Sequence, residues 1–119
     1  MQKDPPKTMA ATILRRSDHY VFQIGAVLVD PQGRCVSWGW NTYNQGTGWL
    51  SGHAEVQAVR RANRKRLRGS SVYVAGMSRK SGQPVLAKPC KACAKLLAHF
   101  GIRMAYFTTK KGWESVVWG

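Results

Sequence analysis

The chain contains few acidic residues, few cysteines and no long apolar segment. Only five of its 119 residues are aspartate or glutamate, against 19 lysines and arginines, and the formal net charge is +14. The acidic residues are too few to balance the basic ones, so the protein has a positive field that attracts polyanions. Three cysteines are too few for the disulfide framework of a small secreted domain, so the composition fits a reducing compartment.

A membrane-spanning helix needs about 20 mostly apolar residues, and the chain has no such run. Residues 1–7 are polar and include two prolines, and no apolar segment follows their charges, as it would in a signal peptide. We therefore expect a cytoplasmic protein without membrane contact. The length suits one domain, residues 1–119, with a single modest core, and residues 1–8 are expected to form a flexible arm.

The hydrophobic pattern predicts helices alternating with strands, which is an α/β arrangement. Helices are expected at residues 9–16, 53–67 and 90–101. Strands are expected at residues 21–29, 34–40, 71–76, 102–108 and 113–118. Only about four residues, 109–112, connect the last two strands, whereas a parallel crossover needs about a dozen. These two strands should therefore pair antiparallel, as a hairpin.

Two short motifs carry the chemical signal of the chain. Glu55 follows His53 by two positions, and Pro89 directly precedes Cys90, with Cys93 three positions further on. A catalytic zinc site usually has three protein ligands and an open fourth position. Zinc lowers the pKa of a bound water to about 7, and a neighbouring carboxylate can carry protons. His53, Cys90 and Cys93 are thus candidate ligands and Glu55 a candidate proton shuttle, as in zinc nucleobase deaminases.

A Cys-x-x-Cys pair by itself also occurs in redox sites and in closed structural zinc sites. A structural site needs a fourth ligand, and neither Cys35, which we interpret as a buried thiol, nor His19 or His99 stands at zinc-finger spacing. His19 and His99 are interpreted as ordinary polar residues. Pro89 marks a helix start, where the helix dipole stabilises thiolates. The catalytic interpretation is therefore the favoured one.

These motifs, with Gly39-Trp40-Asn41 ahead of them, resemble the cytidine deaminase superfamily from about residue 24 to residue 107. The resemblance implies a three-layer α/β/α fold around a mixed five-stranded sheet, a Zn²⁺ cofactor and hydrolysis of cytosine to uracil. It also implies that Asn41 and the backbone of Ala54 contact the substrate, although an asparagine can simply form a turn at a strand end.

Members of this family act on different substrates, namely free cytidine or deoxycytidylate, cytosine in single-stranded DNA or RNA, and adenosine in transfer RNA. In the family, an antiparallel last strand occurs in free-nucleoside deaminases and in some bacterial DNA deaminases. The transfer-RNA editors and the vertebrate polynucleotide editors instead have a parallel last strand, so the expected hairpin argues against adenosine.

The charge leads us to expect cytosine in single-stranded DNA as the substrate, in preference to RNA. A free-nucleotide enzyme needs one or two cations for one phosphate, and a net charge of +14 exceeds that need. One alternative is a free deoxycytidylate or cytidine deaminase, in which a homo-oligomer closes the pocket. Another is a catalytically idle nucleic-acid-binding module that keeps zinc for stability, and the intact Glu55 argues against it.

Further residues are assigned more general roles. A basic run lies at the far end of the second predicted helix from His53, so it is expected to act as an electrostatic patch rather than a base-reading site. Its members are Arg60, Arg61, Arg64, Lys65, Arg66 and Arg68. Aromatic rings can stack on unpaired bases, and Trp49 is our candidate, with Trp40 and Tyr43 near it. Trp40 could equally pack within the sheet. Residues 78–88 are expected to form an extra hairpin or a substrate-facing loop.

Overall fold

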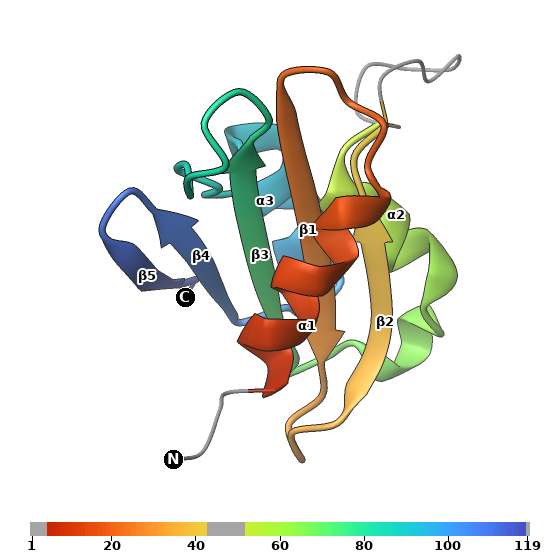
Figure 1. Cartoon of the computed structure of the whole chain (residues 1–119). Coiled ribbons are helices and arrows are strands. Elements are labelled where there is room, and N and C mark those ends of the chain that lie inside the picture. Colours follow the sequence, from red (N-terminus) through yellow and green to blue (C-terminus); the bar gives the residue numbers. More distant parts are fainter. Residues whose placement is uncertain (1–4, 43–51, 119) are drawn as a thin grey trace.

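The computed structural model describes residues 5–42 and 52–118, and it contains the expected mixed sheet and helices (Figure 1). The helices are α1 (Pro5–Ile13), α2 (Ala54–Arg61) and α3 (Lys91–His99), with 3₁₀ turns at Leu14–Arg16 and Arg64–Arg66. The strands are β1 (Phe22–Val29), β2 (Cys35–Trp40), β3 (Ser71–Ser78), β4 (Met104–Thr109) and β5 (Gly112–Val117).

The strands form one sheet in the order β2-β1-β3-β4-β5. Only β3 and β4 are parallel, and α3 connects them; all other neighbours are antiparallel. The pairing of β5 with β4 confirms the hairpin that the short connection predicted. Among the described residues, no helix is long and apolar enough to cross a bilayer.

Helices cover both faces of the sheet, which confirms the three-layer α/β/α fold. Figure 1 shows α1 in front of the sheet and α2 and α3 behind it. The side chains of β1 alternate between two cores, because successive strand residues point to opposite faces. Val27 and Val29 pack with α1, while Ala26 and Leu28 pack in the larger core with α2 and Leu97 of α3.

Glycines let the helices approach the sheet closely. A Cβ atom on Gly39 of β2 would lie 2.4 Å from the carbonyl oxygen of Ala54, and one on Gly25 of β1 would lie 2.5 Å from that of Ala10. Ser37 of β2 also donates a hydrogen bond of 2.6 Å to the carbonyl of Ala58. The first turns of α2 are therefore fixed against β2.

Two expected boundaries were wrong. Residues 5–8 belong to α1 rather than to a flexible arm, because proline is tolerated in the first helical turn, where its missing N–H has no partner to lose. The helix after His53 ends at Arg61 instead of continuing to residue 67. Asn63 accepts a hydrogen bond from the backbone N–H of Lys65, and such local bonds compete with a continuing helix.

Residues 78–88 combine both expected forms. A single bridge pairs Met77 with Pro84, which makes a short hairpin-like turn. The chain then extends past Leu86 and Lys88, which line the cavity described below. Arg79 ties this segment to the loop before β1, because its side chain donates hydrogen bonds to the carbonyl oxygens of Ser17 and His19 at 2.7 and 2.6 Å.

Candidate active site

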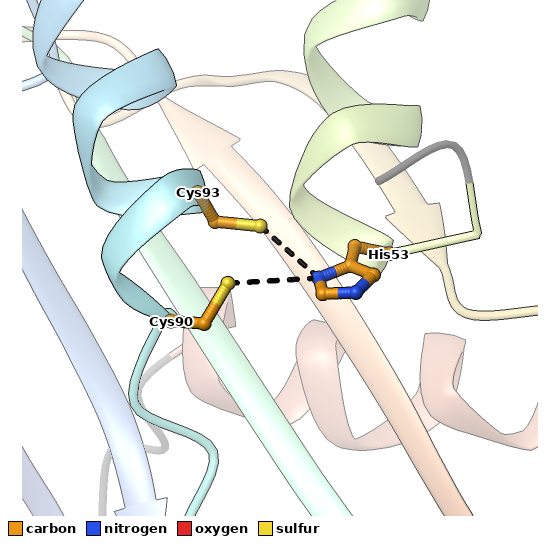
Figure 2. A group of neighbouring side chains, drawn as sticks. All are labelled: His53, Cys90 and Cys93. Atoms are coloured by element: carbon orange, nitrogen blue, oxygen red, sulfur yellow. Dashed lines mark hydrogen bonds between the residues drawn. The ribbon is translucent and has the colours of Figure 1, made fainter. Parts of the chain in front are cut away.

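The three candidate metal ligands stand at the starts of two neighbouring helices. His53 is the N-cap residue of α2, Cys90 is the N-cap of α3, and Cys93 lies in the first turn of α3. Figure 2 shows both sulfur atoms pointing from α3 toward the imidazole ring at the start of α2. The open N–H groups of these first turns provide a positive environment that suits thiolate ligands.

The spacing of the three donor atoms suits a tetrahedral metal ion. The Nδ1 atom of His53 lies 3.2 Å from Sγ of Cys93 and 3.9 Å from Sγ of Cys90, and all three donors lie within 4.8 Å of one another. Zinc bonds of about 2.3 Å to sulfur and 2.0 Å to nitrogen at tetrahedral angles require about 3.6 Å between N and S. The donor set of one imidazole and two thiols therefore fits Zn²⁺.

Burial shifts the pKa values of His53 and Cys93 when no cation is present. It lowers the pKa of His53, which favours the neutral ring that can bind a metal. The pKa of Cys93 is raised, first by burial and then by the nearby charges of Glu55 and Cys90. Because a bound cation favours the thiolate, metal binding at this site should release protons.

Glu55 lies in the first turn of α2 and is nearly buried, with 6% of its surface exposed. Burial raises its pKa to about 7, since removal of water disfavours the charged carboxylate. An acid near neutrality can both accept and donate a proton at physiological pH. The side chain lines the same cavity as His53 and Cys90.

The cavity has a volume of 360 Å³, within the range of about 300–1,000 Å³ that is typical of small-molecule sites. It lies over the ends of α2 and α3 that carry the ligands. The described residues that line it are His19, Ile24, Asn41, Thr42, Gly52, His53, Ala54, Glu55, Leu86, Ala87, Lys88 and Cys90.

His19 is a cavity residue that sequence reasoning missed. Its Nδ1 atom accepts hydrogen bonds from the backbone N–H groups of Val21 and Phe22, both at 3.2 Å, so this tautomer carries its proton on Nε2. A lone histidine in a loop has no sequence signal for such a position, since the loop reaches the site only through the tertiary fold.

Of the three residues predicted to contact substrate, the structure describes two, Asn41 and Ala54. Asn41 and Ala54 both line the cavity, and Ala54 is almost fully buried, so it has little to offer a ligand except its backbone. The Asn41 amide accepts a hydrogen bond from the N–H of Ile24 and donates one to the carbonyl of Phe22. It therefore extends the β2–β1 pairing, and its contact with substrate stays a prediction. Trp49 and Tyr43 lie outside the described residues.

The structure also tests three other interpretations that were made from the sequence. Cys35 is exposed rather than buried, because it begins an edge strand. Trp40 packs against the core under α1, which agrees with packing in the sheet. The basic run is exposed, as expected, from Arg60 to Arg68 apart from Ala62 and Leu67.

The fold and these residues define the type of protein. It is an α/β/α protein with a His-Cys-Cys metal site and a buried carboxylate beside it. The family model of the cytidine and deoxycytidylate deaminase zinc-binding region matches residues 4–109. The chain belongs to this family, whose zinc site corresponds to the possible metal site formed by His53, Cys90 and Cys93.

Solved structures share the fold. The dCMP deaminase of the cyanophage S-TIM5 is 20% identical with a TM-score of 0.69, and the match covers 92% of this chain and 86% of that one. The cytidine deaminase of Mycobacterium leprae is 23% identical with a TM-score of 0.60, over 94% and 91% of the two chains. RibD of Acinetobacter baumannii is 19% identical with a TM-score of 0.64, over 89% of this chain and 27% of that one. A search of the curated proteins found no match.

Proposed function

We propose that this protein is a zinc-dependent hydrolytic deaminase that converts cytosine to uracil and acts on single-stranded DNA. The observation that carries the reaction type is the convergence of three donor atoms within 4.8 Å, with Glu55 lining the same cavity. A purely structural zinc site is closed by four protein ligands. Among the described residues, no fourth histidine, cysteine or carboxylate joins this group.

His53, Cys90 and Cys93 would hold Zn²⁺ in this mechanism. When bound, the ion supplies an activated water for addition at C4 of the base. Glu55 would take up the proton that the attacking water loses, deliver it to N3, and pass the remaining hydroxyl proton to the C4 amino group, which leaves as ammonia. The net reaction consumes one water and yields uracil. The nearly buried position of Glu55 in the same cavity as His53 and Cys90 suits a group that must accept and donate protons in one cycle.

Binding of the base would fall to the remaining cavity residues. We assign Asn41 and the backbone of Ala54 to contacts with the sugar or the base edge, following the family resemblance. Trp49 is kept as a candidate for stacking on the base. A base within a duplex is out of reach of such a cavity, so a polynucleotide substrate must be single-stranded or present a flipped base.

The preference for a polynucleotide is supported by charge. The chain carries 19 lysines and arginines against five acidic residues. Within the described parts of the chain, one ion pair forms, between Arg34 and Asp30. Most of the positive charge therefore remains uncompensated and available to a polyanion.

Free deoxycytidylate is the second candidate substrate. Lys88 and His19 line the cavity, and together they could bind a single phosphate. The similar cyanophage structure is that of a dCMP deaminase, although identity at this level shows the fold alone.

A product assay separates these substrates. Zinc-loaded protein is incubated with equal nucleotide amounts of single-stranded DNA, RNA, duplex DNA, deoxycytidylate and cytidine, and products are identified by mass spectrometry. Glu55→Gln serves as the inactive control. The expected result is that uracil forms much faster in the single-stranded DNA than from deoxycytidylate or any of the other compounds. Conversion of deoxycytidylate alone would make the protein a free-nucleotide enzyme, and no conversion of any cytosine compound would overturn the reaction itself.

A further inference from the structure

Two arginines from different elements lie over one tryptophan at the end of β2. The guanidinium carbon of Arg61, at the end of α2, lies 4.5 Å from the ring centroid of Trp40. That of Arg16, in the 3₁₀ turn after α1, lies 5.4 Å from the same ring. Trp40 ends β2, which is the edge strand of the sheet. The next residue, Asn41, lines the cavity.

Neither guanidinium is neutralised by the described residues. Over residues 5–42 and 52–118, Arg34 is the arginine that pairs with a carboxylate, that of Asp30 at 3.1 Å. Arg16 and Arg61 are both exposed. Two like charges held on one ring repel each other, so an anion that binds between them should be favoured electrostatically.

A guanidinium group that is held on an aromatic ring is already oriented before it binds a phosphate group. The cation rests on the negative face of the indole ring, while its N–H donors lie in the guanidinium plane and can still bind oxygen atoms. A planar fork of donors matches the phosphate group. Ordering such a fork on a ring in advance reduces the entropy that binding must remove. The ring itself is already in contact with two cations, so it is a support for arginine rather than a platform for a base.

We propose that Arg16 and Arg61, held by Trp40, bind the phosphodiester backbone of single-stranded nucleic acid next to the nucleotide whose base enters the cavity. The inference rests on the proposed function for the position of that base. Recognition through phosphate is independent of sequence. The exposed basic run beyond Arg61 continues the positive surface away from the cavity, so the strand would leave the site along α2.

Binding of oligothymidylate tests this surface apart from catalysis, because thymine has no exocyclic amino group to remove. The test variant is Arg16→Gln with Arg61→Gln. The matched control is Arg103→Gln with Lys110→Gln, which removes the same charge near β4, away from the β2 edge. Zinc content and circular dichroism confirm that all proteins are folded. The affinity for a fluorescent 20-nucleotide strand is measured by anisotropy over a range of salt concentrations.

The test variant should lose about tenfold in affinity at low salt. Its slope of log affinity against log salt should fall by about 1.4, since each lost phosphate contact on a single strand contributes about 0.7. The control should keep nearly the full slope. Equal losses in the two variants would overturn the proposal, because they would reflect net charge alone. Arg61→Lys adds a sharper comparison: it keeps the charge, but it should weaken binding if the stacked fork matters.

Deamination assays distinguish failure of this inference from failure of the proposed function. If single-stranded DNA is a substrate, the test variant should raise KM for DNA and leave kcat/KM for deoxycytidylate unchanged. An unchanged KM for DNA would reject the arginine site and leave the DNA deaminase standing. If DNA is not deaminated but the oligothymidylate result is as expected, the surface stands and the proposed substrate fails.

Discussion

The metal site and the β2 edge lie side by side but are built in different ways. The metal site combines buried Cys93, half-buried His53 and exposed Cys90, which are fixed by helix starts and by close packing of α2 on β2. The β2 edge consists of exposed arginines whose arrangement depends on one tryptophan ring. A change in the first region should therefore abolish chemistry. A change in the second should tune affinity and leave the fold intact.

The largest effect is expected from loss of a metal ligand. Cys93→Ala removes a buried thiol and leaves two protein ligands, so zinc binding and all deaminase activity should be lost, with a fall in Tm. Zinc content is measured by plasma mass spectrometry on the purified protein. Cys35→Ala is the control, because it removes an exposed cysteine outside the metal site. Zinc retained by Cys93→Ala would mean that the ligands have been misassigned.

Glu55→Gln should separate chemistry from metal binding. The amide keeps the size of the side chain but cannot carry a proton, and a general acid–base group typically contributes about 10²–10⁴-fold. The variant should therefore lose at least about 100-fold in kcat and keep its zinc. If turnover persists at the wild-type rate, the proton shuttle lies elsewhere.

Gly39→Ala tests whether packing of α2 on β2 positions the site. The new methyl group would meet the backbone of Ala54 at 2.4 Å and of Ala58 at 2.5 Å, and backbone cannot rotate away. Overpacking of this kind typically costs about 1–3 kcal/mol, and the shift of His53 should also weaken zinc binding. Chemical denaturation and a zinc affinity measurement check the two effects.

Gly76→Ala is the matched control for this change. Its methyl group would meet the ends of the side chains of Ile24, Val85 and Ala87 at 2.9–3.1 Å, and the Ile24 chain can adjust its rotamer. A smaller loss of stability with unchanged zinc affinity is expected. Equal losses of zinc affinity in both variants would show that zinc binding does not depend specifically on the close packing of α2 on β2.

The candidate metal site could be predicted from the sequence because its signal is local, and the catalytic role of Glu55 stays a prediction. His53, Glu55, Cys90 and Cys93 occur at short, fixed spacings beside helix starts, and a helix start orients nearby side chains in a known way. The antiparallel pairing of β5 with β4 followed from the short connection between them, and the mixed five-stranded sheet followed from the family resemblance. In contrast, His19 reaches the cavity through a loop, and the contacts of Arg16 and Arg61 with Trp40 bring three elements together. Contacts of this kind depend on side-chain positions in space, so the spacing of residues in the sequence does not predict them.

Salt should affect the two candidate substrates differently. Binding of a polyanion weakens steeply with salt because counterions are released, whereas a mononucleotide releases few. Between about 50 and 200 mM NaCl, KM for single-stranded DNA should rise at least about tenfold, while KM for deoxycytidylate should change only a few-fold. Steady-state kinetics with both substrates at each salt concentration would test this. Parallel changes would indicate that both substrates use the same one or two cations.

The smallest effect is expected at the β1–β2 turn, far from both regions. Asp30 accepts hydrogen bonds from the N–H groups of Arg34 and Gln32 at 2.9 and 3.0 Å and pairs with the Arg34 side chain. The backbone bond to Arg34 is the largest of the effects that hold the pKa of Asp30 below its usual value. Asp30→Asn keeps an oxygen acceptor for both N–H groups, so it should lower Tm only slightly.

The pH dependence of that small effect has a definite sign. A carboxyl group whose pKa is lower in the folded state stabilises the fold above its unfolded pKa, about 3.9 for aspartate. This stabilisation is lost as the pH falls through the folded pKa. The Tm difference between wild type and Asp30→Asn should therefore be present at pH 7 and shrink toward zero as the pH falls through the lowered pKa of the folded state. A difference that grows on acidification would mean that the neutral acid, rather than the carboxylate, is the stabilising form.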